Sequence, residues 1–208
     1  MLVFTTRNRP AVLEYSLKKT REHYDGEILV IDDNSDTKTY NQNICKNYDA
    51  RLLYNETRLG IPRSKNRGFN ELLSYDRQFW FDDDAFPKAG WLERITEAQQ
   101  YEPHLLYLKE WAHICREEDL GHGLARFSGA TACFMSFTKE IYKDVHGFAE
   151  GYGIYGGWHH NLTLKLAGRY VSLTDASDYI YSFDLDKCPE DFKSNFNSSL
   201  PQEERVKK

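Results

Sequence analysis

Short apolar runs alternate with helical patterns through the first hundred residues, and this alternation constrains the fold more than any other feature of the sequence. The runs compatible with β-strands are residues 2–5, 27–31, 51–54, 78–81, 105–108, 130–137 and 170–173. Between the early runs, apolar residues recur at helical spacing, as in the series Tyr40, Ile44 and Tyr48. Strands that alternate with amphipathic helices form a mostly parallel sheet with helices on both faces. The sequence therefore predicts an α/β fold with a mixed, mostly parallel sheet.

The length of the chain indicates one domain. Its 208 residues, 40% of them hydrophobic, suffice for one substantial α/β core but are few for two. The alternating rhythm ends after Tyr101, and the polar stretch over residues 113–128, with Gly121 and Gly123, is expected to form a mobile or acceptor-facing loop. The expected organisation is a domain over residues 1–174, with halves of about 1–100 and 101–174, and a partly flexible extension over 175–208.

Charge, hydropathy and cysteine usage exclude several classes of protein. A net charge of −5 offers no general basic face, which disfavours non-specific nucleic-acid binding. No stretch approaches the roughly 20 apolar residues that span a bilayer, so no membrane span is expected. The cysteines form no C-x-x-C pair, which favours reduced thiols and a cytoplasmic protein. They are Cys45, Cys115, Cys133 and Cys188.

Three adjacent aspartates follow the apolar run over residues 78–81. On an extended chain Asp82 and Asp84 share one face while Asp83 points to the other, so two carboxylates would converge where the strand ends. Their mutual repulsion favours a bound cation such as Mg²⁺ or Mn²⁺, with phosphate oxygens completing its shell. The alternative is a solvated acidic turn before Pro87.

A second acidic pair, Asp32 and Asp33, follows the strand predicted over residues 27–31. In an open α/β sheet the carboxyl ends of parallel strands form the ligand crevice, so both acidic groups point to one side. A carboxylate here could accept a base N–H or a ribose hydroxyl, and a turn or helix-cap role is equally open. The first strand ends at the same edge with Thr5 and Arg7, whose guanidinium can stack on a base or grip phosphate.

A cluster of cations opens the helix predicted from about residue 62. Arg63 and Lys65, followed by Asn66, would offer positive charge and amide groups to phosphate at a helix N-terminus. Taken alone, the cluster is more typical of an ordinary solvated helix start.

Together and in this order, these segments resemble the family 2 glycosyltransferases of the Rossmann-like GT-A fold, over roughly residues 2–174. The matching segments are 3–10 (the opening strand and turn), 30–35 (the Asp-Asp-Asn/Gly-Ser signature), 65–68 (an Arg-Asn-x-Gly element) and 81–93 (the metal-binding D-x-D motif with its Pro and Gly-Trp-Leu-Glu). Each is a loose pattern alone, but four in the right order make a specific signal.

The resemblance implies roles for these residues. Thr5, Arg7 and Asp33 would meet the base and ribose, with Asp33 accepting from uracil or a related pyrimidine. Arg63 or Lys65 would reach the diphosphate, Asp82 would contact the ribose or the metal, and Asp84 would hold the metal, Mn²⁺ or Mg²⁺. The other candidates for binding the nucleotide-sugar are Asp32, Asn66 and Asp83.

The chain departs from the family pattern where a catalytic Asp is expected. Residues 147–150 resemble the family's Gly-Phe-Asp-Glu, but His159 stands at the position of the acid, between Trp158 and His160. A neutral His is a competent base near pH 7 and can also ligate a metal. The candidates for the general base are therefore His159, His160 and Glu150, and Gly157 and Trp158 would border the acceptor. The alternative is that both histidines merely begin a helix.

The function that the resemblance implies is metal-dependent, inverting transfer of a sugar from a nucleotide-diphosphate donor, with a UDP-sugar favoured. The acceptor would be a hydroxyl of a glycan, lipid-linked sugar, protein, metabolite or modified nucleobase, facing residues 101–174. A sugar-nucleotide pyrophosphorylase is disfavoured because residues 5–10 contain no Gly for a phosphate loop. The remaining alternative is a module that binds nucleotide-sugar or glycan without turnover.

Overall fold

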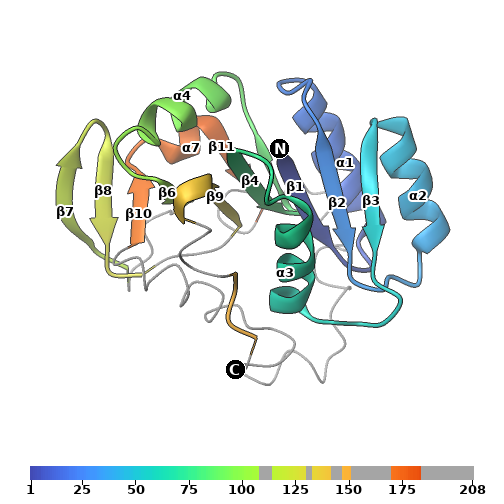
Figure 1. Ribbon diagram of the computed structural model, residues 1–208. Coiled ribbons are helices and arrows are strands. Elements are labelled where there is room, and N and C mark those ends of the chain that lie inside the picture. Colours follow the sequence, from blue (N-terminus) through green and yellow to red (C-terminus); the bar gives the residue numbers. More distant parts are fainter. Residues whose placement is uncertain (108–113, 130–132, 142–146, 151–169, 184–208) are drawn as a thin grey trace.

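The computed structural model describes residues 1–107, 114–129, 133–141, 147–150 and 170–183, and its centre is a six-stranded sheet with the order β3-β2-β1-β4-β9-β6 (Figure 1). The strands are β1 (Leu2–Thr6), β2 (Ile28–Asp32), β3 (Ala50–Tyr54), β4 (Arg77–Asp82), β6 (His104–Leu106) and β9 (Phe134–Thr138). β1 to β4 are mutually parallel, whereas β9 runs antiparallel to both β4 and β6. The predicted mixed, mostly parallel sheet is confirmed.

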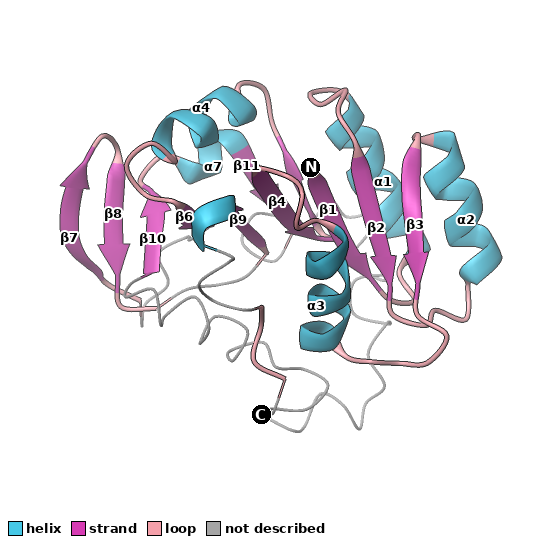
Figure 2. Ribbon diagram, in the orientation of Figure 1, coloured by secondary structure: helices cyan, strands magenta, loops and turns pink. Residues whose placement is uncertain are grey.

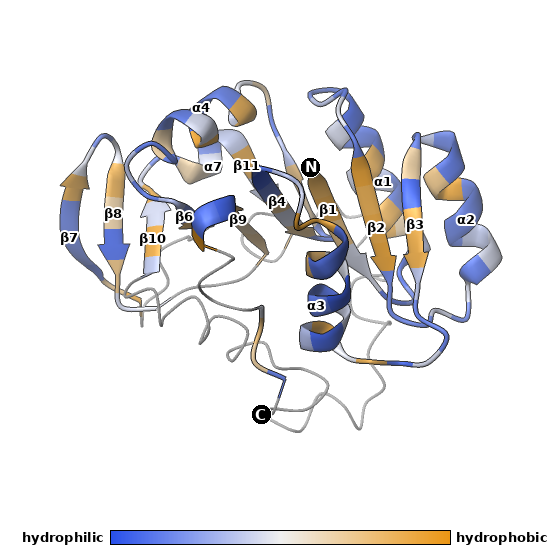
Figure 3. Ribbon diagram, in the orientation of Figure 1, coloured by the Kyte–Doolittle hydropathy of each residue, from blue (hydrophilic) through white to orange (hydrophobic). Residues whose placement is uncertain are grey.

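Helices cover both faces of this sheet (Figures 1 and 2). They are α1 (Pro10–Arg21), α2 (Lys38–Asn47), α3 (Ile61–Glu71) and α4 (Trp91–Ala98). α1, α2 and α4 pack on one face through residues such as Leu17, Ile44 and Trp91, and α3 packs on the other, where Phe69 lies in one cluster with Trp80. The hydrophobic strands β1 and β2 therefore lie between more hydrophilic helices (Figure 3). Among the described helices, none is long and apolar enough to cross a membrane.

α3 approaches the sheet closely because position 68 carries no side chain. A Cβ atom at Gly68 would collide with the side chain of Ile31 and would lie 3.0 Å from Trp80. This close packing brings Lys65, on the same helix, to within 3.0 Å of Asp82 at the end of β4.

A second sheet of three strands occupies the region of residues 113–128, so the prediction of a loop there is wrong. Its strands, in the order β10-β8-β7, are β7 (Arg116–Gly121), β8 (Leu124–Phe127) and β10 (Tyr170–Leu173). Gly121, His122 and Gly123 form the turn with φ of 76°, 54° and 72°, a region that glycine enters at little cost. The segment is polar because β7 is an exposed edge strand, while β8 buries Leu124 and Phe127.

Secondary structure continues past residue 174, where the core domain was expected to end. The elements involved are β5 (Ala85–Pro87), α7 (Ala176–Tyr179) and β11 (Ile180–Ser182). β11 pairs antiparallel with β5, and the Phe183 N–H donates to the Asp84 carbonyl at 2.9 Å. The rings of Tyr15, Phe86 and Phe183 pack beside this pair. The segment around β11 therefore supports the chain that follows the three aspartates.

Candidate functional site

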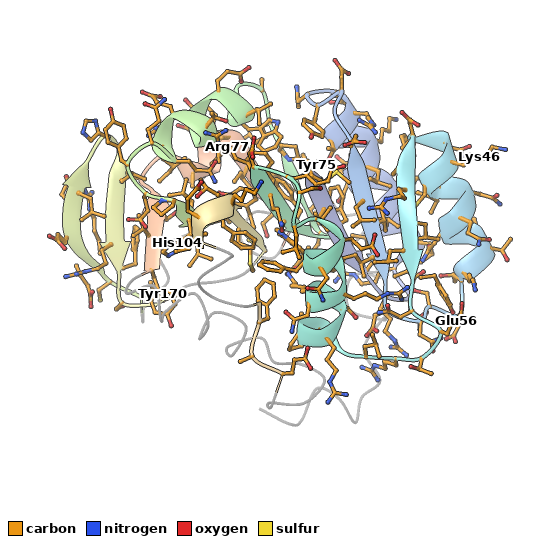
Figure 4. All side chains as sticks on the ribbon, viewed as in Figure 1. Lys46, Glu56, Tyr75, Arg77, His104 and Tyr170 are labelled. Carbon is orange, nitrogen blue, oxygen red and sulfur yellow. The ribbon has the colours of Figure 1, made fainter. Side chains whose placement is uncertain are left out.

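The polar residues predicted to form the site meet at one edge of the central sheet. β1, β2 and β4 end in register, with Thr5 opposite Asp82 and Thr6 opposite Asp32. Glu56, labelled in Figure 4, follows β3 at the same edge. Because parallel strands bring their carboxyl ends together, the connections after β1, β2, β3 and β4 converge here, at the expected position of a ligand crevice.

Asp82 is the one aspartate of the run that belongs to the strand. Its side chain is 38% exposed, and its Oδ1 accepts hydrogen bonds from Lys65 Nζ at 3.0 Å and Thr5 Oγ1 at 3.4 Å. Lys65 itself is only 1% exposed, so its ammonium offsets the charge of Asp82. In this structure Lys65 therefore braces Asp82. The contact of Lys65 with a diphosphate, which the resemblance implies, stays a prediction.

Asp83 and Asp84 leave the strand in a turn and converge on Arg9. Arg9 Nη1 lies 3.2 Å from Asp83 Oδ1, and Arg9 Nη2 lies 2.6 Å from Asp84 Oδ2. The Thr6 hydroxyl donates to the other Asp83 oxygen at 2.7 Å. The alternation of faces assumed for an extended chain does not hold, because β4 ends at Asp82 and both following carboxylates turn toward Arg9.

Burial changes the protonation of these two carboxyl groups. Asp83 is 3% exposed, and burial raises its pKa to about 7; Arg9 opposes this rise and the neighbouring Asp84 adds to it. Burial also raises the pKa of Asp84 above its ordinary value, and Arg9 again opposes the rise. A carboxyl group with a raised pKa must give up any proton it holds when a metal ion binds to it.

Asp82 and Asp84 are the candidates to bind a divalent cation that is shared with a ligand. Carboxylate oxygens are the ligands that Mg²⁺ prefers, and Mn²⁺ takes similar ones. Arg9 and Lys65 together leave an excess of negative charge on the ionised run. Within the described residues, however, no group of three or more His, Cys, Asp or Glu could hold a metal ion. Asp82 and Asp84 would thus need phosphate oxygens to complete the shell.

The side chain of Asp32 is buried and forms hydrogen bonds within the protein. It is 0% exposed, its Oδ1 accepts from the Ser35 N–H at 2.8 Å, and its Oδ2 accepts from Asn41 Nδ2 at 2.7 Å. The contact of Asp32 with a nucleotide stays a prediction. The alternative, a structural turn and capping role, fits what is observed.

Asp33 holds the start of α3. Its carboxylate accepts from the Leu59 N–H at 2.7 Å and from the Gly60 N–H at 2.9 Å, and Asn55 Nδ2 adds a third hydrogen bond at 3.1 Å. Asp33 is 8% exposed, so little of it faces solvent. Its contact with uracil stays a prediction.

The sequence reasoning missed Asn55 at this edge, and it missed the pairing of Arg9 with the aspartates. Asn55 joins three elements, because it donates to Asp33 and to Ser64 Oγ and accepts from Arg67 Nη1 at 2.6 Å. Its place directly after the third strand was the signal that could have found it. Arg9 stood in the segment after the first strand, next to Pro10, but its pairing with the aspartates depends on residues more than seventy positions away.

The start of α3 is tied to residues 147–150. Asn66 donates to the Phe148 carbonyl at 2.9 Å and to Glu150 Oε1 at 2.6 Å, and its own oxygen accepts from the Phe148 N–H at 2.6 Å. The exposed Arg63 lies 3.5 Å from the other Glu150 oxygen. Asn66 therefore serves to position Glu150.

Across the site, the Nε atom of Arg7 is buried and has no hydrogen-bond partner within the described chain.

The remaining predicted site residues lie outside the described residues. They are Gly157, Trp158, His159 and His160. The structural description ends at Glu150 and resumes at Tyr170, so the roles of these four residues stay predictions.

A mixed sheet whose parallel strands end at an acidic turn is the arrangement expected of the GT-A fold. The sequence profile described as Glycosyl transferase family 2 matches residues 1–161, which is more than half of the chain. The chain belongs to glycosyl transferase family 2. The predicted family membership is thereby confirmed. A comparison with curated proteins gave no match.

Solved structures with a similar fold include several glycosyltransferases. GalNAc-T7 has a TM-score of 0.67 at 12% identity, with 83% of this chain and 42% of that chain covered. TarS from S. aureus (residues 1–349) has 0.64 at 16% identity, covering 87% and 59%. The mannosyltransferase PcManGT from Pyrobaculum calidifontis has 0.61 at 15% identity, covering 83% and 53%. These likenesses establish the GT-A fold, and this chain spans about half the length of the proteins it resembles.

Proposed function

We propose that this chain transfers a sugar from a nucleotide-diphosphate donor, with a UDP-sugar favoured, to an acceptor hydroxyl, and that it uses Mn²⁺ or Mg²⁺. The observation that carries the proposal is the run Asp82-Asp83-Asp84 at the carboxyl edge of the sheet, where Thr5 and Lys65 contact Asp82. Among the similar structures, GalNAc-T7 was crystallised with UDP, GalNAc and Mn²⁺, TarS with UDP-GlcNAc, and PcManGT with GDP-Man and Mn²⁺. These ligands support a nucleotide-sugar donor and a divalent cation.

The donor would lie along the ends of β1, β2 and β4. Thr5 and Arg7 end the first strand beside the connection that carries Asp33, whose N–H donates to the Thr6 carbonyl at 3.0 Å. An arginine in this position can stack on a base or grip phosphate oxygens. Arg63 is exposed at the start of α3 and is the cation best placed to meet the diphosphate.

Asp82 and Asp84 would hold the divalent cation. When bound, the cation would offset the charge that develops on the departing nucleoside diphosphate. The acceptor hydroxyl must lose its proton as it attacks the anomeric carbon, and this inverting step needs a general base. We assign that role to His159, with His160 and Glu150 as the alternatives and Gly157 and Trp158 beside the acceptor.

A thermal-shift panel tests donor binding. A ligand that binds only the folded state raises its stability by RT ln(1 + [L]/Kd). We expect UDP and UDP-sugars to raise the melting temperature in the presence of Mn²⁺ or Mg²⁺, and to do so more than GDP or CDP. A larger shift with GDP than with UDP would show that the site prefers guanosine to uridine. No shift with any nucleotide would contradict the proposal.

A second candidate is a module that binds the nucleotide-sugar without turnover. The observation in its favour is that His159 stands where family members carry a catalytic Asp. Transferases often pass sugar slowly to water, whereas a pure binder releases no nucleoside diphosphate, so donor hydrolysis separates the two.

The cytoplasmic location suggested by the cysteines stays a prediction.

A further inference from the structure

Arg9 occupies the same carboxylates that the proposed function assigns to the metal. Its guanidinium spans Asp83 Oδ1 at 3.2 Å and Asp84 Oδ2 at 2.6 Å. The side chain of Arg9 is 19% exposed, and those of Asp83 and Asp84 are 4% and 7% exposed. Pairs this short and this shielded from water are stronger than surface ion pairs, because the surroundings screen them less.

Contacts that do not involve Arg9 also hold the turn. The Ser16 hydroxyl donates to the Asp83 carbonyl at 2.6 Å, and the Thr6 hydroxyl donates to the Asp83 carboxylate at 2.7 Å. The Phe183 N–H donates to the Asp84 carbonyl at 2.9 Å. These bonds come from β1, α1 and the end of β11, so several elements fix the backbone of the turn. The Arg9 charge is therefore not needed to shape it.

A divalent cation on Asp84 would meet a second cation at short range. Arg9 Nη2 already bonds to one oxygen of this carboxylate, and Lys65 similarly shares Asp82. Positive charges that share a carboxylate repel one another, and the repulsion is large where water is excluded. The run of three aspartates thus has two internal cations in place, and a metal ion alone must compete with them.

We propose that Arg9 is an internal competitor for the metal site, so that the divalent cation binds tightly only together with a nucleoside diphosphate. The phosphate oxygens would add negative charge. They would also accept hydrogen bonds from the Arg9 N–H groups once these no longer bond to Asp84. Metal and nucleotide would then raise each other's affinity by the same factor, as linkage requires. This inference rests on the proposed metal-dependent function and adds to it a role for Arg9, which couples the affinity for the metal to the affinity for the donor.

The test measures Mn²⁺ binding at pH 8 by electron paramagnetic resonance, with and without UDP. The variants are Arg9→Gln, which removes the competing charge; Arg9→Lys, which keeps it; and Arg51→Gln, which removes an exposed cation on β3 as a matched control. We expect the wild type, Arg9→Lys and Arg51→Gln to bind Mn²⁺ weakly alone and at least about tenfold more tightly with UDP. Arg9→Gln should bind Mn²⁺ alone roughly tenfold more tightly than the wild type and gain less from UDP. Uridine, which lacks phosphates, should not enhance binding in any variant.

The outcomes distinguish this inference from the proposed function. If the wild type binds Mn²⁺ with UDP but folded Arg9→Gln binds Mn²⁺ alone no more tightly than the wild type, the competition is refuted and the metal-dependent function stands. If the wild type binds Mn²⁺ equally well with and without UDP, the competition is refuted even when Arg9→Gln fails to fold. If no Mn²⁺ binds under any condition, both proposals fall.

Discussion

Single side chains at the carboxyl edge of the sheet are organised by pairs of opposite charge. Lys65 approaches the aspartate run from α3 on one face of the sheet, and Arg9 approaches it from the start of α1 on the other. The acidic run itself could be predicted, because three carboxylates after an apolar strand are visible in the sequence. Their pairing could not, since it depends on a turn after Asp82 and on partners far away in the chain. The burial of Asp32 could not be predicted for the same reason, because only the fold reveals it.

The buried Asp83 makes stability depend on pH. Its pKa is near 3.8 in an unfolded chain and about 7 in the folded protein, so between these values the folded state holds a proton that the unfolded state has released. The free energy of unfolding should therefore fall as the pH rises from 5 to 7 in the absence of divalent cations. Urea unfolding in EDTA at both pH values measures this, and Asp83→Asn should flatten the dependence. Equal slopes for the wild type and the variant would contradict the assignment.

Asp33 is expected to contribute to stability through the start of α3. Asp33→Asn places an amide NH₂ group where the carboxylate accepts from backbone N–H groups of Leu59 and Gly60, so unfolding should become easier by roughly 1–3 kcal/mol. Asp25→Asn, at an exposed aspartate, is the matched control and should change little. Affinity for UDP and CDP, measured alongside, addresses base recognition. A variant with unchanged stability but no preference for UDP would show that Asp33 reads the base and does not brace the helix.

At the scale of elements, amphipathic periodicity made the strands and helices of the nucleotide-binding half predictable. Each of its helices buries one stripe against a sheet whose central strands are buried on both faces, and such patterns are visible in sequence. The β7–β8 hairpin could not be predicted, because β7 is an exposed, highly charged edge strand without an alternation of apolar residues. β11 could not be predicted either, because it has only three residues and depends on pairing with β5 from another part of the chain.

The pairing of β11 with β5 predicts that Phe183 stabilises the domain. Its ring is 3% exposed and packs with Tyr15, Phe86 and Tyr181. Phe183→Ala should lower the free energy of unfolding by about 3 kcal/mol or more, as is usual for a buried aromatic ring. Tyr40→Ala, at a residue 53% exposed on α2, should change it little. Chemical denaturation measures the free energy of unfolding of both variants. Similar values for the two would show that the segment after residue 174 lies apart from the core.

For the molecule as a whole, the order of its layers accounts for the position of the site. Four parallel strands bring the connections of the first hundred residues to one edge, and α1 and α3 on opposite faces supply the cations that flank the aspartates. Fold and family could be predicted because four motifs occur in the order that this topology requires. The acceptor side could not be predicted to the same depth, because His159 departs from the family pattern and no motif in the sequence names an acceptor.

The central claim is that this chain uses a divalent cation on Asp82 and Asp84 to turn over a nucleotide-sugar. The most direct measurement is the release of nucleoside diphosphate from a panel of UDP-sugars, in Mn²⁺ and in EDTA, by the wild type, Asp84→Asn and the control Asp25→Asn. We predict release by the wild type and the control in Mn²⁺, its loss in EDTA, and a decrease of at least about tenfold in Asp84→Asn, which loses a charged metal ligand. Release that is equal in Mn²⁺ and EDTA, or equal in Asp84→Asn and the wild type, would contradict it.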